Sequence, residues 1–81
     1  MVKIVFEGPL SRQYGKSVEI YENSFYSIKA KLKDLGILNE KDEVKPGYIV
    51  LVGDKDIRLF TDDERVLFNN EIRVIPINHG G

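Results

Sequence analysis

Residues 71–81 read EIRVIPINHGG, and this stretch decides how the rest of the chain is interpreted. Ile72 and Val74 alternate with Arg73 and Ile75, and alternation at a two-residue period predicts a β-strand with two distinct faces. The two glycines that close the stretch have no side chain to bury and the most backbone entropy to lose, so they add nothing to a core. The stretch therefore predicts a final strand followed by a thin, flexible tail that can enter a narrow slot on a partner.

The beginning of the chain carries two more strand patterns. Residues 2–7 place three apolar side chains on one face: Val2, Ile4 and Phe6. Residues 18–21 alternate in the same way, which suggests a second strand antiparallel to the first. Glycine and proline signals over residues 8–15 predict a connecting loop between the two strands.

One segment has the period of a helix instead. Its apolar side chains recur at helical spacing: Phe25, Ile28, Leu32 and Leu35. Asn23 or Ser24 can cap its start, and Gly36 can end it in a left-handed conformation. The pattern predicts one amphipathic helix of about three turns, with its lysines toward water.

The second half of the chain predicts two further strands. Residues 37–45 are interpreted as a polar connector, and residues 48–52 form an apolar run typical of a strand. A Gly-Asp turn then leads to a short strand predicted over residues 57–60. The acidic residues 62–65 follow as a turn, although Asp62, Asp63 and Glu64 could also be interpreted as a metal site.

The order of these elements predicts the fold class. One helix laid across one mixed sheet is the simplest way to bury a single apolar stripe. The first and last strands are the most apolar, so we expect them at the centre of the sheet, adjacent and parallel. The sequence thus predicts an α+β, β-grasp fold, with a mixed sheet of four to five strands and one main helix packed on one face, formed by residues 1–77, and a tail over residues 78–81.

Composition narrows the function classes. The chain has 81 residues, no cysteine, and 12 basic against 13 acidic residues. The balanced charge disfavours a nucleic-acid interface, and the lack of cysteine excludes a thiol nucleophile and cysteine-bound metals. No signal peptide or membrane-length apolar run is visible, so we expect a cytoplasmic protein.

The chain resembles the ubiquitin-like sulfur carriers, a family that includes MoaD, ThiS, the ubiquitin-related modifier and the small archaeal modifier proteins. The opening VKIVFEGPLSRQYG is similar to the family's first strand and leucine-containing loop, and NNEIRVIPINHGG resembles its ending. Two features depart from the pattern. Asn69-Asn70 stands where the family usually has Gly-Asp, and Glu7 stands where molybdopterin-type members often carry an apolar residue that faces their partners.

The resemblance implies chemistry at the end of the chain. The carboxylate of Gly81 would be adenylated with ATP by an activating enzyme and then converted to a thiocarboxylate or captured by a lysine. Gly80 and His79 would thread into that enzyme, although a lone histidine in a tail is also interpreted as a solvated residue. The protein would be a carrier or substrate rather than an enzyme, with no bound cofactor or metal. ATP would be used by the activating enzyme alone.

The helix can cover only one face of the sheet, which leaves apolar residues on the other. We expect a docking patch for the adenylating enzyme beside the tail, formed by Val5, Phe60, Phe68, Ile75 and Ile77.

The sequence is compatible with several outlets and partners. The outlet could be tRNA thiolation with a sulfurtransferase, conjugation to protein lysines, or the small subunit of molybdopterin synthase beside its large subunit. The His-Gly-Gly ending favours the first two. An alternative from another class is a non-catalytic β-grasp interaction module, and an RNA-binding domain is disfavoured by the charge.

Overall fold

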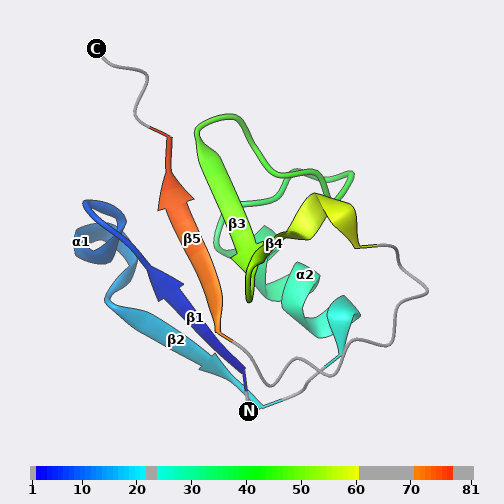
Figure 1. Cartoon of the computed structure of the whole chain (residues 1–81), viewed down its shortest axis with the longest axis horizontal. Coiled ribbons are helices and arrows are strands. Elements are labelled where there is room, and N and C mark those ends of the chain that lie inside the picture. The colour runs from blue at the N-terminus through cyan, green and yellow to red at the C-terminus, as the bar shows by residue number, and fades with distance from the viewer. Residues whose placement is uncertain (1, 22–23, 61–70, 78–81) are drawn as a thin grey trace.

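Five strands form one mixed sheet in the order β2-β1-β5-β3-β4 (Figure 1). The computed structural model describes residues 2–21, 24–60 and 71–77. The strands are β1 (Val2–Phe6), β2 (Ser17–Ile20), β3 (Tyr48–Val52), β4 (Lys55–Asp56) and β5 (Ile72–Pro76). β5 lies in the middle, parallel to β1 and antiparallel to β3. The first and last strands are therefore adjacent and parallel, and the predicted β-grasp fold is confirmed.

The helix α2 (Phe25–Asp34) covers one face of this sheet. Its first turn is capped by Ser24, whose hydroxyl oxygen accepts a hydrogen bond from the Ser27 N–H at 3.0 Å. Gly36 follows the helix with φ 85°, a left-handed conformation that glycine adopts without steric cost. Both boundaries agree with the caps predicted from the sequence; Asn23 lies outside the described residues.

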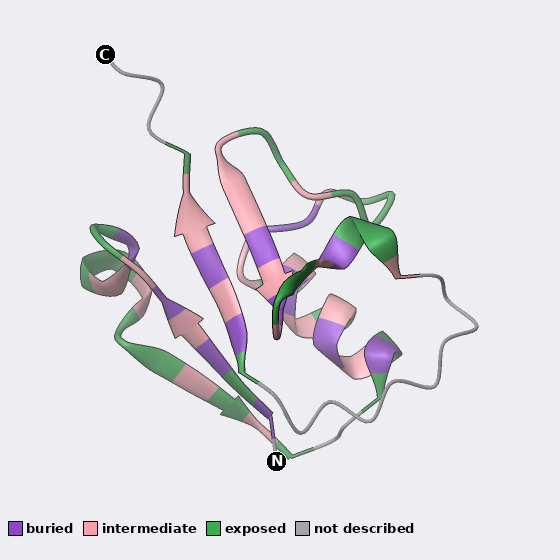
Figure 2. Cartoon of the chain, in the orientation of Figure 1, coloured by how far each residue is buried: buried purple, intermediate pink, exposed green. Residues whose placement is uncertain are grey.

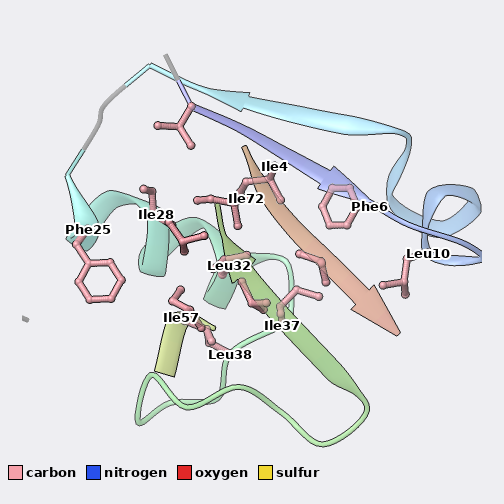
Figure 3. Close-up of a cluster of buried hydrophobic side chains, with 14 residues drawn as sticks. Ile4, Phe6, Leu10, Phe25, Ile28, Leu32, Ile37, Leu38, Ile57 and Ile72 are labelled. Carbon is pink, nitrogen blue, oxygen red and sulfur yellow. The ribbon is translucent and has the colours of Figure 1, made fainter. Parts of the chain in front are cut away.

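The core lies between α2 and the sheet (Figure 3). Side chains of β1, β5 and α2 reach zero exposure there: Val2, Ile4, Ile28, Leu32, Ile72 and Val74. Along β5, buried and partly exposed residues alternate, as the bands in Figure 2 show. The alternation read from residues 71–77 thus describes the two faces of the central strand.

Two segments predicted as a connecting loop and a polar connector contribute to the core. Residues 8–15 contain a short helix, α1 (Leu10–Tyr14), rather than only a loop. In α1, Leu10 is only 7% exposed, and the burial of its side chain stabilises the folded conformation of the segment. In the connector after α2, Ile37 and Leu38 are also buried. Periodicity could not show this, because each segment supplies only one or two apolar residues.

The strand predicted over residues 57–60 is wrong. β4 spans only Lys55–Asp56, and a 3₁₀ helix, η1 (Ile57–Leu59), follows it. The carboxylate of Asp56 accepts hydrogen bonds from the Arg58 N–H at 2.9 Å and from its Nε at 3.0 Å. Such local side-chain contacts to the backbone compete with a strand ladder and favour a turn. The turn carries Ile57 into the core at 5% exposure.

Among the described residues, no helix has both the length and the apolar character needed to cross a membrane.

Candidate functional site

The end of β5 is held firmly to the sheet. Pro76 lies opposite Tyr48 of β3, and proline has no N–H to donate to the ladder. The next residue restores the pairing, because the Ile77 N–H donates to the Gly47 carbonyl at 2.8 Å. The chain is therefore anchored through Ile77, and residues 78–81 begin directly beyond that bond.

The turn after β1 passes beside this anchored end. A Cβ added at Gly8 would lie 3.8 Å from Cγ of Pro76, and Gly8 has φ 59°. Behind the turn, the ring of Tyr14 stacks on Phe6 with 4.9 Å between centroids. Burial, followed by hydrogen bonding to Tyr48, raises the pKa of Tyr14. The turn and the aromatic side chains thus frame the last residues of β5.

The face of the sheet opposite α2 carries a compact group of apolar side chains. Val5, Ile49, Leu51 and Ile75 lie on the three middle strands and Ile77 follows β5 directly; these five residues form the open-face patch. The register places Ile75 beside Ile49, and Arg73 between Val5 and Leu51. The four strand residues of the patch are partly buried and Ile77 is 36% exposed. Together they form an apolar surface that continues to the anchored end of β5.

An ion pair crosses this apolar surface. Both Nε and Nη2 of Arg73 donate to Oε1 of Glu7, at 2.9 and 2.7 Å. The Glu7 N–H donates to the Val74 carbonyl at 3.1 Å, which extends the pairing of β1 with β5 by one residue and places Glu7 beside Ile75. Charge therefore lies within the open-face patch rather than only at its rim.

The structure brings together only part of the predicted docking patch. Val5, Ile75 and Ile77 share the open face as expected. The placement of Phe60 was wrong: its ring lies 6.2 Å from that of Phe25, on the side of α2. The reason is η1, which turns the chain away from the sheet edge toward the helix. Phe68 lies outside the described residues.

The predicted residues of the tail also lie outside the described residues: His79, Gly80 and Gly81. The acidic residues 62–64 lie outside them as well. Their assigned roles stay predictions. In the part of the chain that the structure describes, no three His, Cys, Asp or Glu side chains are grouped to hold a metal ion.

Sequence reasoning missed Ile49 and Leu51. A signal for them was present, because residues 48–52 are apolar at every position, and such a run indicates a strand covered on both faces. It also missed the pairing of Glu7 with Arg73, since these residues are 66 positions apart and only the register of β1 against β5 joins them.

The other side of the molecule carries a hollow of about 520 Å³ between α2, η1 and the loop after α2. Its lining is mixed, with the rings of Phe25 and Phe60 beside charged residues. Asp42 of this lining is paired with Lys33 at 2.7 Å. No residue of β5 lines this hollow.

A mixed sheet with parallel first and last strands at its centre, one helix on one face, and an anchored final strand defines a ubiquitin-like β-grasp protein. The sequence model of the family Urm1 (Ubiquitin related modifier) matches residues 13–81. The chain belongs to this family. It is therefore a ubiquitin-like sulfur carrier or protein modifier, and a substrate carrier rather than a catalyst.

Solved structures share the fold. The crystal structure of Urm1 from Sulfolobus solfataricus is similar with a TM-score of 0.70 and 28% identity, over 93% of this chain and 99% of that one. SAMP1 from Haloferax volcanii shares the fold with a TM-score of 0.63 and 13% identity, over 99% and 98% of the two chains. The HVO 2177 protein of the same organism also shares the fold, with a TM-score of 0.63 and 21% identity, over 99% of this chain and 85% of that one. No curated protein sequence is significantly similar to this chain.

Proposed function

We propose that the carboxylate of Gly81 is the reacting group, activated by an ATP-dependent, ubiquitin-activating-type enzyme. The observation that carries the proposal is the anchoring of β5 through Ile77, directly before a stretch that ends in Gly-Gly. A rigid strand delivers the tail in a defined direction, and the two glycines offer no side chain to obstruct a narrow channel. His79 would enter the same channel and form a hydrogen bond with the enzyme.

The proposed reaction begins with adenylation. A carboxylate oxygen of Gly81 attacks the α-phosphorus of ATP, pyrophosphate leaves, and an acyl-adenylate forms. For sulfur transfer, the terminal sulfur of a persulfide held by a sulfurtransferase attacks the acyl carbon and AMP leaves. A thiol then cleaves the S–S bond, which leaves the thiocarboxylate on Gly81 and a disulfide on the sulfurtransferase side. For attachment, the amine of a target lysine attacks the acyl carbon, AMP leaves, and the nitrogen loses a proton to form the amide. ATP belongs to the activating enzyme, and the reaction requires no cofactor held by this chain. We place the reaction in the cytoplasm, where ATP is available.

The length of the tail links this chemistry to the open-face patch. Four residues follow Ile77, and an extended chain spans at most about 3.6 Å per residue, or roughly 14 Å in all. The enzyme must therefore hold the folded body close to its nucleotide. The open-face patch reaches the anchored end of β5 and offers apolar surface for that contact. We propose that the activating enzyme docks there.

Two outlets are proposed for the activated carboxylate, namely tRNA thiolation and attachment to protein lysines. Transfer of sulfur requires a sulfurtransferase as second partner, whereas attachment requires an exposed lysine on the target. The two differ in the nucleophile that displaces AMP, and sulfur transfer also requires a thiol that cleaves the S–S bond formed with the sulfurtransferase.

The test is intact mass spectrometry of the pure protein after incubation with ATP and its purified activating enzyme. We expect the mass of an AMP adduct, and after addition of a sulfur donor the exchange of one oxygen for sulfur at Gly81. The matched control lacks only Gly81, and circular dichroism should show an unchanged fold for it.

Other outcomes would redirect the proposal. An AMP adduct that forms equally well without Gly81 would contradict it. A cellular activity that survives the same deletion would favour a plain β-grasp interaction module. Co-purification with a molybdopterin synthase large subunit would move the outlet to molybdopterin synthesis.

A further inference from the structure

We infer that the Glu7–Arg73 pair selects the partner of the open-face patch. To bind there, a protein surface must offer a hydrogen-bond donor to Glu7 and an acceptor to Arg73, surrounded by apolar contacts. The inference rests on the proposed function, since the partner considered is the activating enzyme. It assigns to two residues of this chain a specificity role that the apolar side chains around them cannot have.

The geometry leaves part of each charged group unused. Arg73 places two donors on the same carboxylate oxygen, Oε1 of Glu7. Among the described residues, Oε2 of Glu7 accepts no hydrogen bond and Nη1 of Arg73 donates none. One acceptor and one donor group therefore remain available to a partner.

The position of the pair means that any partner of the open-face patch contacts these two groups. Arg73 extends from the central strand between Val5 and Leu51, and Glu7 lies beside Ile75. A partner that covers the apolar side chains must also cover the pair. The two charged side chains are 42% and 35% exposed in the free protein, so water still solvates them.

Covering the pair has a cost that depends on the partner. An apolar surface would remove water from both charges and leave their free groups unsatisfied, which is strongly unfavourable. A surface that offers an acceptor to Arg73 and a donor to Glu7 restores those hydrogen bonds, and charge-assisted bonds are the stronger kind. The pair therefore discriminates between partners of similar shape by penalising the wrong one.

The pair could instead serve only to join β1 to β5. A charge reversal separates the two roles, because Glu7→Arg with Arg73→Glu keeps an ion pair within the sheet but exchanges the donor and the acceptor shown to the partner. We expect the single changes Glu7→Leu and Arg73→Leu, and also the reversed pair, to raise the KM of the protein in adenylation about tenfold or more. We expect kcat to stay near the wild-type value.

The reversed pair should unfold in urea at the same midpoint as the wild type. Lys33→Leu is the matched control, because it removes an ion pair on the side of α2 and should leave KM unchanged. A reversed pair with wild-type KM, or Leu variants with wild-type KM, would overturn the inference.

A binding experiment separates this inference from the proposed function. Titration calorimetry with the activating enzyme and the chain lacking Gly81 measures docking without any reaction, and the three variants should weaken it to the same extent. Binding by the wild type without adenylation would contradict the proposed function alone. Adenylation with unchanged variants would contradict the inference alone, and no binding by the wild type would overturn both.

Discussion

The two faces of the sheet are formed by the same strands, yet they differ in packing and chemistry. On the α2 face, Ile72 and Val74 of β5 have no exposed surface. On the open face, Arg73 and Ile75 of the same strand are only partly covered. One residue of register thus separates a core position from a surface position, because successive side chains of a strand point to opposite faces.

The difference shows how a small protein divides its apolar residues. Full burial of an isoleucine stabilises a fold by about 1.5–3 kcal/mol, and a chain of this size needs every such contribution. The helix α2 can cover only one face, so the apolar residues of the other face stay available to a partner. The covered face holds the fold together, and the open face is the one proposed to dock.

The largest effect is expected from a matched pair of truncations on β5. Ile72→Ala creates a cavity in a fully buried site and should lower the free energy of unfolding by about 2–5 kcal/mol. Ile75→Ala removes the same atoms from the open face and should cost about 1 kcal/mol or less. Urea unfolding followed by circular dichroism measures both. Equal losses would mean that the two faces do not differ in the way described.

A charge on the open face should affect docking rather than folding. Ile75→Asp is expected to weaken adenylation by about thirtyfold, since a central apolar contact in an interface is often worth about 2 kcal/mol. The urea midpoint should stay close to that of Ile75→Ala, which serves as the control for fold. If Ile75→Asp is adenylated as well as the wild type, the proposal that the activating enzyme docks on the open face is wrong.

A smaller loss of stability is expected at the start of α2, which forms the cover of the buried face. Ser24→Ala removes the acceptor of the Ser27 N–H and should cost about 1 kcal/mol in unfolding free energy. Ser24→Asp keeps an acceptor at the same place and should retain most of the wild-type stability. Adenylation should be unchanged in both variants, because the cap lies on the other side of the sheet.

The smallest expected effect is a pH dependence of the free energy of unfolding, caused by the Lys33–Asp42 pair on the α2 side. The hydrogen bond from Lys33 holds the pKa of Asp42 below its ordinary value and raises that of Lys33. The carboxylate therefore stabilises the fold at pH values above its unfolded pKa of about 3.9, and this is lost as the pH falls through the lowered pKa. The contribution of Lys33 to the stability of the fold is present below the ordinary pKa of lysine and is lost as the pH rises through the raised pKa of Lys33.

Asp42→Asn tests this dependence. Asn tolerates the left-handed conformation of residue 42, which has φ 61°, so the substitution removes the charge with little backbone strain. The stability difference between wild type and variant should shrink at acidic pH and in high salt. A difference that is constant from acidic to neutral pH would show that the pair does not contribute.

Local patterns predicted much of the fold. The alternation of residues 71–77 and the cap at Ser24 depend on neighbours within a few residues, and both are confirmed. The short segments were harder. α1 and η1 each bury a single apolar residue, Leu10 and Ile57, and one residue has no period to detect.

The site was predicted in part, for the same reason. Val5, Ile75 and Ile77 followed from strand alternation alone, whereas Phe60 was misplaced because the turn after β4 depends on local hydrogen bonds of Asp56. The contribution of β3 to the open face required knowledge of which strand lies beside β5.

By itself, the sequence determined the two faces of β5 and the amphipathic helix α2, because periodicity is a property of neighbouring residues. Only the tertiary structure decided that Glu7 meets Arg73 and that β3 completes the open-face patch. These contacts join residues far apart in the chain, and they depend on strand order and register. The packing of the whole sheet against α2 sets both, since a slip of one residue would move the buried side chains into water.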